Sequence, residues 1–578
     1  MEQQKKVIPN RLPRDVYQAL ETIVGRDNIS EDRAIVETYS RFGIDIPGYL
    51  KKHARDASNI PACVVLPAAT EEIQAIVRVA NTYRVPFISM TNGQLGVACM
   101  PTTSAPTLCI HYSRMNRVIG IDEESMTMRV QPYVDYGQVM AEAMKRGLWN
   151  GGTPLATTLC KIASQAALGG LWQTSKKYGS LGKNITGLTL VLPDGELLQT
   201  GSYAVAGVGD FWEHAPGPDL VSLFRGSAGS SGIIAEMTIK LHPWPSDPDM
   251  PEPEAGRPCI QTYHDDRYDR PDPPKNFRLY WMEFPDMETQ IQALREYAHA
   301  GVGIGLNATG IYNVYYCSAT QSQTLKWAAE NFFPAYNIYI ISGGFTSDKQ
   351  LSYEEKVIRA IAEKFSGIFL SSEYKPDVLE ALRPWNLDCI RHVCGYRMSR
   401  HFYLDTWFCS GAAEVGKAAQ DIWTEAISTI GETYVTDRGG VDNTPFMYAS
   451  DPAGRNFFTE ADVYPDGMDP LQLQKAQQLM LFSHARTFAR KIGPGVTGFG
   501  ASVEPLTTFF PEMGPNVNLL LRKFRKVLDP NGVCAPGRTV FTEEELTHLP
   551  LPLVEALNGL RKMNAMEPVV IDSKKTAD

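Results

Sequence analysis

Apolar and polar positions in the first part of the chain follow helical and strand spacings in turn. The apolar residues Ile73, Ile76, Val77 and Ala80 are three and four positions apart, as on one face of a helix. This spacing predicts a helix over residues 70–83, with Thr70 as its N-cap and two glutamates in its first turn. The short apolar run Phe87–Met90 then predicts a strand.

A glycine-containing loop follows this strand, in the stretch PFISMTNGQLGVACMP at residues 86–101. Glycines at positions 93 and 96 allow sharp turns, and they let backbone N–H groups approach a phosphate without a lysine or arginine. An ordinary surface turn has the same composition, so the loop alone leaves both interpretations open.

The remaining pattern up to residue 241 is a mixture of short strands and helices. Strands are predicted at residues 63–66, 107–110, 127–130, 188–192, 196–199 and 233–241. Asp135 is placed to cap a helix over residues 136–146, and Gly147 is placed to end it. The pair Asp194-Gly195 is a strong hairpin signal between two of the strands.

The composition changes at Pro243, where a proline-rich, acidic stretch predicts a domain boundary. Beyond it, residues 260–520 alternate strand-like runs with amphipathic helices. The strands are expected at 278–282, 311–316, 338–342 and 400–406, and the helices at 288–300, 323–332, 353–365, 413–430 and 471–491. This order is typical of α+β architecture, with helices on one face of a mainly antiparallel sheet.

Composition and charge exclude several classes of function. A chain of 578 residues is too long to fold around a single hydrophobic core. A net charge of −10 argues against a general nucleic-acid binder. The sequence predicts no membrane span, no apolar signal core and therefore a cytoplasmic protein. The ten cysteines lack the spacings of zinc or iron–sulfur sites, so we expect buried thiols and no metal.

Several motifs occur together and in order: the glycine loop, SRMNRVIGID, the segment ending KKYGSLGKNITGLTLVLPDGELLQTG, then DLVSLFRGSAGSSGIIAEMTIKLHP, and LDPNGVCAPGR near the end. In this arrangement the chain resembles the flavoprotein family of vanillyl-alcohol oxidase and p-cresol methylhydroxylase. D-lactate and glycolate dehydrogenase subunits share the same FAD domain. The resemblance covers residues 12–245 and 515–540 well, and the region between them only loosely.

The resemblance implies an α+β protein with an FAD-binding domain of two subdomains at residues 1–245. It also implies a cap, or substrate, domain of antiparallel sheet and helices at 246–515, and a segment at 516–578 that returns to the FAD domain. FAD is the implied cofactor, with a non-covalent attachment favoured because the first glycine loop lacks a histidine. A tether from a cap histidine or tyrosine stays open.

The matching segments also imply which residues contact FAD. In the first loop, whose N–H groups would hold the diphosphate, they are Met90, Thr91, Asn92, Gly93, Gln94, Leu95 and Gly96. In the second segment they are Gly152, Thr153, Ser164, Gln165, Ala167 and Gly170, and in the third Gly229, Gly232, Ile233 and Ile234. Small residues suit these positions because backbone packs directly on a flat ring.

Catalytic candidates come from the densest polar cluster of the cap. A strand at 400–406 would place His401, Tyr403 and Asp405 on one face, suited to removing a proton from an alcohol. Arg400 and His392 lie nearby in sequence, where an arginine suits an anionic substrate. Glu504 is a further candidate base. A solvated strand edge with ordinary ion pairs explains the same cluster, so both interpretations stand.

We therefore expect an FAD-dependent oxidase or dehydrogenase that takes a hydride from an alcohol or benzylic carbon of a small, aromatic substrate. A D-2-hydroxy-acid dehydrogenase subunit is the alternative. The phenol-oxidising members carry a Tyr-Arg pair near the C-terminal end of the cap, and the corresponding stretch here, VTGFGASVEPLTTFF, has neither residue. The HxGDGNxH motif that is usual in the hydroxy-acid branch is absent too. A catalytically inert flavin-bound subunit is a third interpretation. An electron-acceptor protein and a homodimer or larger assembly are the partners that the resemblance suggests.

Overall fold

The structure, a computed structural model, describes most but not all of the chain. The described residues are 11–39, 60–91, 103, 105–152, 160–167, 170–214, 217–227, 229–246, 275–310, 317, 321–388, 405–431, 445–463, 470–490, 492–494, 515–537, 558–559 and 561–562. The predicted strand at 311–316 and the start of the one at 400–406 lie outside these residues.

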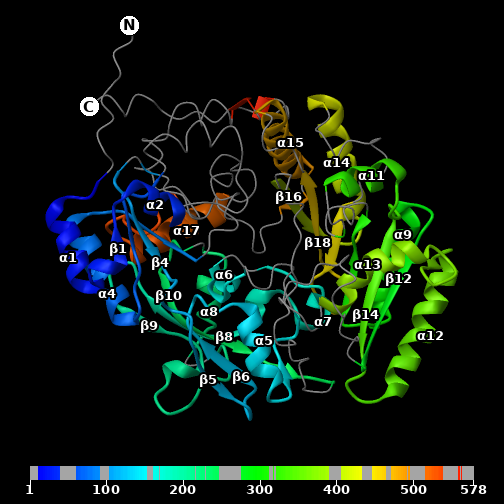
Figure 1. The fold of residues 1–578 in the computed structure, drawn as a ribbon, viewed down its shortest axis with the longest axis horizontal. Helices are drawn as coiled ribbons and strands as arrows, with labels where there is room; N and C mark the ends of the chain where they lie inside the picture. Colours follow the sequence, from blue (N-terminus) through cyan, green and yellow to red (C-terminus); the bar gives the residue numbers. More distant parts are fainter. Residues whose placement is uncertain are drawn as a thin grey trace, which may run out of the picture.

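The first sheet is mainly parallel and has the strand order β1-β2-β4-β3. Its strands are β1 (Ile29–Ser30), β2 (Cys63–Val65), β4 (Leu108–His111) and β3 (Phe87–Met90). Strands β2, β4 and β3 pair in parallel, and β1 pairs antiparallel with β2. The helices α1 (Arg14–Val24), α2 (Arg33–Tyr39) and α4 (Thr70–Tyr83) belong to this part of the fold, shown in blue in Figure 1.

Helix α4 confirms the predicted helix at 70–83, but the prediction of its cap is wrong. The N-cap is Ala69, and Thr70 is already inside the helix without a capping hydrogen bond. Instead, the Glu72 carboxylate accepts a hydrogen bond from the Ala68 N–H at 2.8 Å. A carboxylate in the first turn thereby satisfies a backbone donor at the helix start.

The second sheet is antiparallel, with the strand order β5-β6-β10-β8-β9. Its strands are β5 (Val118–Asp122), β6 (Thr127–Val130), β10 (Ile233–Lys240), β8 (Ile185–Val191) and β9 (Leu197–Gln199). Helices α5 (Tyr136–Met144), α6 (Ile162–Ala167), α7 (Ser175–Tyr178) and α8 (Val221–Phe224) accompany it. Asp135 caps α5 through a capping box with Gln138, as predicted for this helix start.

A charged cluster crosses the second sheet. The Arg129 guanidinium on β6 donates to Asp210 at 2.9 Å, to Glu236 at 2.8 Å and to the Thr189 hydroxyl at 2.6 Å. It also lies 3.7 Å from the ring centre of Tyr203. One arginine therefore holds two carboxylates on neighbouring segments.

The third sheet has eight strands in the order β15-β12-β14-β13-β17-β18-β16-β19, and every pairing in it is antiparallel. The strands are β12 (Phe277–Glu283), β13 (Gly305–Ala308), β14 (Asn337–Gly343), β15 (Ile368–Phe369), β16 (Asp405–Gly411), β17 (Phe446–Ala449), β18 (Phe457–Val463) and β19 (Gly493–Pro494). This sheet and its helices confirm the α+β class with an antiparallel cap.

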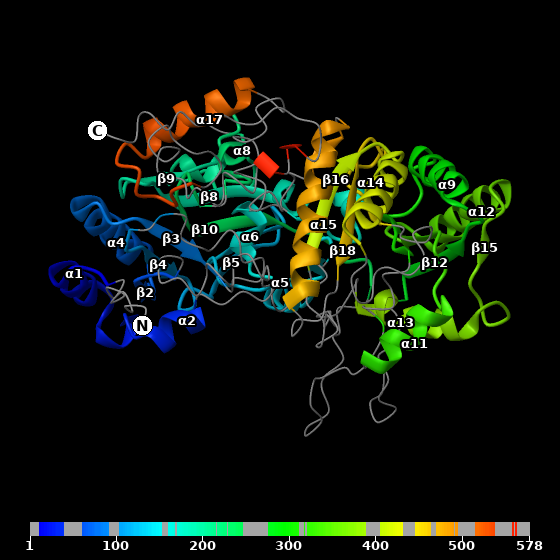
Figure 2. The ribbon, with the colours of Figure 1, turned by 90° about the horizontal axis from the view of Figure 1, so that it is seen from above.

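Helices cover one face of the third sheet. They are α9 (Met287–His299), α12 (Asp348–Lys364), α14 (Val415–Ile430) and α15 (Pro470–Ala489), and their apolar faces share one core with the sheet. Helices α11 (Gln321–Glu330) and α13 (Pro376–Asp388) lie on the other side of the sheet, as Figure 2 shows. The second core, on that side, also contains Trp149 and Trp244 from the first half of the chain.

The C-terminal part of the described chain packs beside the first sheet. Helix α17 (Pro515–Leu528) precedes a turn in which both Asp529 carboxylate oxygens accept backbone hydrogen bonds. The Phe87 N–H then donates to Val533, and the Ala535 N–H donates to Phe87. The domain limits at 245 and 515 stay a prediction. Within the described residues, none of the helices is both long and apolar enough to cross a membrane.

Candidate functional site

A pocket lies where the first two sheets meet. Its walls come from segments far apart in sequence: the end of β3, the residue after β4, helix α6, strand β8, and the turn between α8 and β10. The lining residues are Ser89, Met90, Thr91, Tyr112, Ala163, Ser164, Ala167, Leu190, Phe224, Ser227, Gly229, Gly232 and Ile234. The three segments that the sequence analysis selected for FAD therefore meet at one pocket.

Two glycines in the turn before β10 are required by its geometry. Gly229 has φ +80° and Gly232 has φ +144°. Residues with a side chain are strained in these backbone conformations. A Cβ on Gly232 would lie 3.0 Å from the Val191 carbonyl oxygen, and one on Gly229 would lie 3.0 Å from the Ser89 hydroxyl. The turn can therefore present bare backbone to the pocket.

The described pocket wall is uncharged and combines apolar side chains with several hydroxyl groups. Among its described lining residues, hydroxyls come from serine, threonine and tyrosine, and none is a lysine or arginine. The cation Lys161, next to α6, is paired with Asp135 at 3.1 Å. A phosphate at this wall would thus rely on hydroxyl and backbone N–H donors, which are the donors that the sequence analysis expected.

The structure brings seven predicted FAD contacts to the pocket: Met90, Thr91, Ser164, Ala167, Gly229, Gly232 and Ile234. Ile233 is buried in β10 opposite Val191. Gln165 is buried in α6, where it donates to the Leu181 carbonyl and accepts from the Tyr136 hydroxyl. The roles of all these residues as FAD contacts stay predictions.

Two further predicted residues lie toward the third sheet. Gly152 has φ +156°, and a Cβ on it would lie 2.1 Å from the Thr174 hydroxyl. That hydroxyl donates to the Gly151 carbonyl at 2.6 Å, so the glycine pair packs directly against the loop that precedes α7. Gly170, with φ +120°, starts the same loop.

The other predicted residues lie outside the described part of the chain. They are the FAD contacts Asn92, Gly93, Gln94, Leu95, Gly96 and Thr153, and the catalytic candidates His392, Arg400, His401, Tyr403 and Glu504.

A histidine that the sequence analysis did not select lies beside the end of β3. His111 ends β4 opposite Met90 and is almost fully buried. Its Nδ1 accepts a hydrogen bond from the Ser113 N–H at 3.3 Å, so the neutral ring carries its proton on Nε2. Burial lowers the pKa of His111 to about 4, so the ring is neutral at pH 7.

Polar contacts join the first half of the chain to the third sheet. The buried Lys176 ammonium on α7 donates to the Val302 carbonyl at 2.8 Å and to the Gly303 carbonyl at 3.2 Å. On strand β13, the Asn307 amide donates to the Gln173 carbonyl at 3.0 Å. Burial lowers the pKa of Lys176 to about 8. We call this contact region the domain junction.

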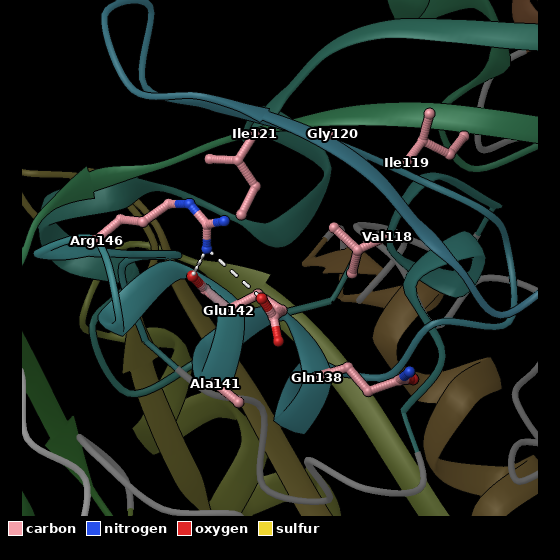
Figure 3. Close-up of a pocket in the computed structure, with 8 residues that line it drawn as sticks. All are labelled: Val118, Ile119, Gly120, Ile121, Gln138, Ala141, Glu142 and Arg146. Atoms are coloured by element: carbon pink, nitrogen blue, oxygen red, sulfur yellow. Dashed lines mark hydrogen bonds and ion pairs between the residues drawn. The ribbon is translucent and has the colours of Figure 1, made fainter.

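A second pocket, drawn in Figure 3, lies between β5 and α5 and has a volume of about 540 Å³. Its charged residues are already paired: Arg146 donates to the Glu142 carbonyl at 2.9 Å and lies 3.3 Å from the Glu123 carboxylate, and Lys145 lies 2.8 Å from the Glu142 carboxylate. The rest of its wall is mostly apolar. It contains none of the residues selected from the sequence, so we take the first pocket as the candidate site.

Comparison with known proteins identifies the class of this site. Residues 61–201 match the family model described as "FAD binding domain". The matched range contains β3, β4 and α6, which supply most of the pocket wall. The chain therefore contains an FAD-binding domain, and FAD is its cofactor.

Curated relatives match part of the chain. Glycolate oxidase subunit GlcD of Bacillus subtilis is 28% identical over 44% of this chain and 48% of its own length. The mitochondrial D-lactate dehydrogenase [cytochrome] of Arabidopsis thaliana is 28% identical over 41% of this chain and 38% of its own length. The chain thus spans about half, or less, of the length of these relatives.

Solved structures match nearly the whole chain. A 4-ethylphenol oxidase from Gulosibacter chungangensis covers 91% of this chain and 97% of its own at 17% identity, with a TM-score of 0.67. A p-cresol methylhydroxylase covers 92% and 99% at 16% identity, with a TM-score of 0.68. The chain has the FAD-binding fold of the p-cresol methylhydroxylase type, as the sequence motifs predicted.

Proposed function

We propose that this chain is an FAD-dependent oxidoreductase that takes a hydride from an alcohol or benzylic carbon of a small, aromatic substrate. The observation that supports it best is the pocket at which the three predicted FAD segments meet. Bound FAD supplies the hydride acceptor, and the protein supplies binding, orientation and electrostatics. The site residues named below are part of the proposal.

The chain's own residues would hold the cofactor through backbone and hydroxyl donors. Thr91, Ser164 and Ser227 bring hydroxyl groups to the pocket, and the two glycines of the following turn, Gly229 and Gly232, bring backbone without side chains. Hydrogen bonds to a charged acceptor contribute roughly 1.5–3 kcal/mol each. A few such hydrogen bonds would offset the free energy that the diphosphate loses when it leaves water, without a cation in the pocket wall.

Structural similarity supports an aromatic substrate over a 2-hydroxy acid. The ethylphenol oxidase and the p-cresol methylhydroxylase match almost the whole chain with TM-scores of 0.67 and 0.68, above the 0.59 of an alkyldihydroxyacetonephosphate synthase that covers a similar share. The glycolate and D-lactate relatives match less than half of the chain.

The test is the visible spectrum of the purified protein, followed by anaerobic reduction. We expect oxidised-flavin bands that stay in the supernatant after acid precipitation, because the FAD is not tethered. We then expect p-cresol, 4-ethylphenol or vanillyl alcohol to bleach the bands, and D-lactate and glycolate to leave them unchanged.

Other outcomes would contradict specific parts of the proposal. Bleaching by D-lactate or glycolate alone would replace the aromatic substrate with a 2-hydroxy acid. Flavin that is bleached by none of these compounds but by dithionite would indicate the inert flavin-bound subunit. Coloured protein in the acid pellet would show a covalent tether.

A further inference from the structure

Three buried carboxamides at the domain junction have polar atoms that the protein leaves unsatisfied. Asn150 follows β7 (Leu148–Trp149), Gln173 lies in the loop before α7, and Asn307 lies on β13. Their side chains are 2%, 2% and 0% exposed. Both amide atoms of Asn150 and Gln173, and the Oδ1 of Asn307, have no hydrogen-bond partner in the part of the chain that the structure describes.

Such atoms are costly to bury. A buried donor or acceptor without a partner costs about 1–3 kcal/mol, and native proteins keep few of them. Other buried amides of this chain are bonded. Gln165 donates to Leu181 and accepts from Tyr136, and Gln290 donates to the Asn337 carbonyl at 2.7 Å. Buried polar atoms of other types, such as the Ser342 and Thr459 hydroxyls, also lack a partner in the described residues, but the carboxamides without one gather at the junction. Their unused hydrogen-bonding capacity is suited to a binding partner.

Backbone and side-chain contacts hold the three amides in one region. The Asn307 amide donates to the backbone carbonyl of Gln173. The next residue, Thr174, donates to the carbonyl of Gly151, which directly follows Asn150. Gly305 has no Cβ, and one added there would lie 2.3 Å from the Gln173 carbonyl oxygen. The segment that contains Gln173 thus meets strand β13 at close range, and the segment that contains Asn150 packs against that segment.

The same region continues from the candidate pocket. Ser164 and Ala167 of α6 line the pocket, and the chain then leads through Gly170 to Gln173. In the proposed function the pocket holds the diphosphate of FAD, and we place the reactive ring toward the junction, where this segment meets the third sheet.

The hydrogen-bonding groups of the amides indicate which edge of the flavin ring they would bind. A carboxamide donates and accepts at once, so it complements an uncharged edge on which carbonyl and N–H groups alternate. The pyrimidine edge of the isoalloxazine has this pattern. We propose that Asn150, Gln173 and Asn307 bind the pyrimidine edge of the flavin ring. This inference rests on the proposed function.

The test substitutes Gln173→Met, which keeps length and removes both polar atoms, and measures binding of FAD to the apo-protein by flavin fluorescence. Each hydrogen bond contributes about 2- to 12-fold in affinity, so we expect the dissociation constant for FAD to rise roughly 5- to 150-fold. The melting temperature of the apo-protein should stay the same or rise, because an uncompensated desolvation is removed. Asn150→Leu should act in the same direction.

Two controls separate binding at the ring edge from effects at the adenine end or on the fold. ADP carries the diphosphate and adenine without the ring, so its competition with FAD for the wild-type and Gln173→Met proteins should give an unchanged ADP constant. Gln290 is equally buried but bonded, so Gln290→Met should lower the melting temperature and leave the FAD constant unchanged.

Three results would overturn the inference while wild-type protein still binds FAD. An unchanged FAD constant would remove the amides from the flavin site, even if substrate binding weakened. An equal loss for ADP would place the effect at the adenine end or in the fold as a whole. A large fall in apo-protein melting temperature would show that the amides are satisfied without a ligand. Failure of the proposed function differs, because the wild-type protein would then bind no FAD.

Discussion

The buried histidine at the end of β4, His111, makes a specific pH dependence testable. The ordinary pKa of 6.5 falls to about 4 for His111 in the folded protein because burial disfavours its charged form. The unfolded chain therefore binds a proton on this residue between pH 6.5 and 4, when the folded chain does not. Stability from His111 is complete above pH 6.5 and is lost as the pH falls toward 4.

The size of the effect follows from the two pKa values. Each pKa unit corresponds to about 1.4 kcal/mol, so the full loss is about 3 kcal/mol, of which about 2 kcal/mol is lost by pH 5. The substitution His111→Asn removes the titration and keeps an acceptor, since an asparagine Oδ1 can bond the N–H two residues on, here that of Ser113.

The assay is urea unfolding of both proteins at pH 7.5 and pH 5, followed by tryptophan fluorescence. At pH 7.5 the variant should be less stable by about 1 kcal/mol, because the ring contacts with Tyr39 and Tyr133 are lost. Between pH 7.5 and pH 5, wild type should lose about 2 kcal/mol more than the variant. His299→Gln, on an exposed residue, should behave as wild type. Equal pH dependence of wild type and His111→Asn would refute the reasoning.

Other contacts give further tests. Arg129→Met leaves two mostly buried carboxylates without their cation and should lower the free energy of unfolding by about 3 kcal/mol, measured in urea. Gly305→Ala forces a Cβ toward the Gln173 carbonyl and should cost about 1–3 kcal/mol, seen as a lower melting temperature. The pKa of Lys176 is lowered to about 8, so wild-type stability should gain about 2 kcal/mol relative to Lys176→Met between pH 8 and pH 10. An unchanged difference across that range would contradict a buried, proton-releasing lysine.

Local patterns in the sequence predicted most of the helices and strands. The helix at 70–83 and the strands at 87–90 and 127–130 have the predicted bounds, because each buries one regular face or run. The α5 cap was predictable because Asp135 and Gln138 are close in sequence. Thr70 is not the cap because it already has helical backbone geometry as the first residue of α4, and Ala69 takes the N-cap position.

The candidate site was predictable where small residues recur, and not where it depends on long-range packing. Gly229 and Gly232 mark a turn that needs positive φ, and a sequence motif records that need. His111, Lys176 and Gln173 have no such signal, because their burial depends on segments that are distant in sequence. The pairs Lys176–Val302 and Asn307–Gln173 span 126 and 134 residues, and no periodicity spans such distances.

The pocket and the domain junction differ in the polar groups that they offer to a ligand. The pocket between the first two sheets has hydroxyls and bare backbone but no charged residue in its described lining, which suits a tightly held diphosphate. At the junction, Lys176 fixes the loop 302–303 through carbonyl acceptors, so its charge is used to join the halves of the chain. The amides beside it keep free hydrogen-bonding capacity. Because rigid attachment and unsatisfied polar groups occur side by side there, the junction is pre-organised to bind an uncharged ring edge.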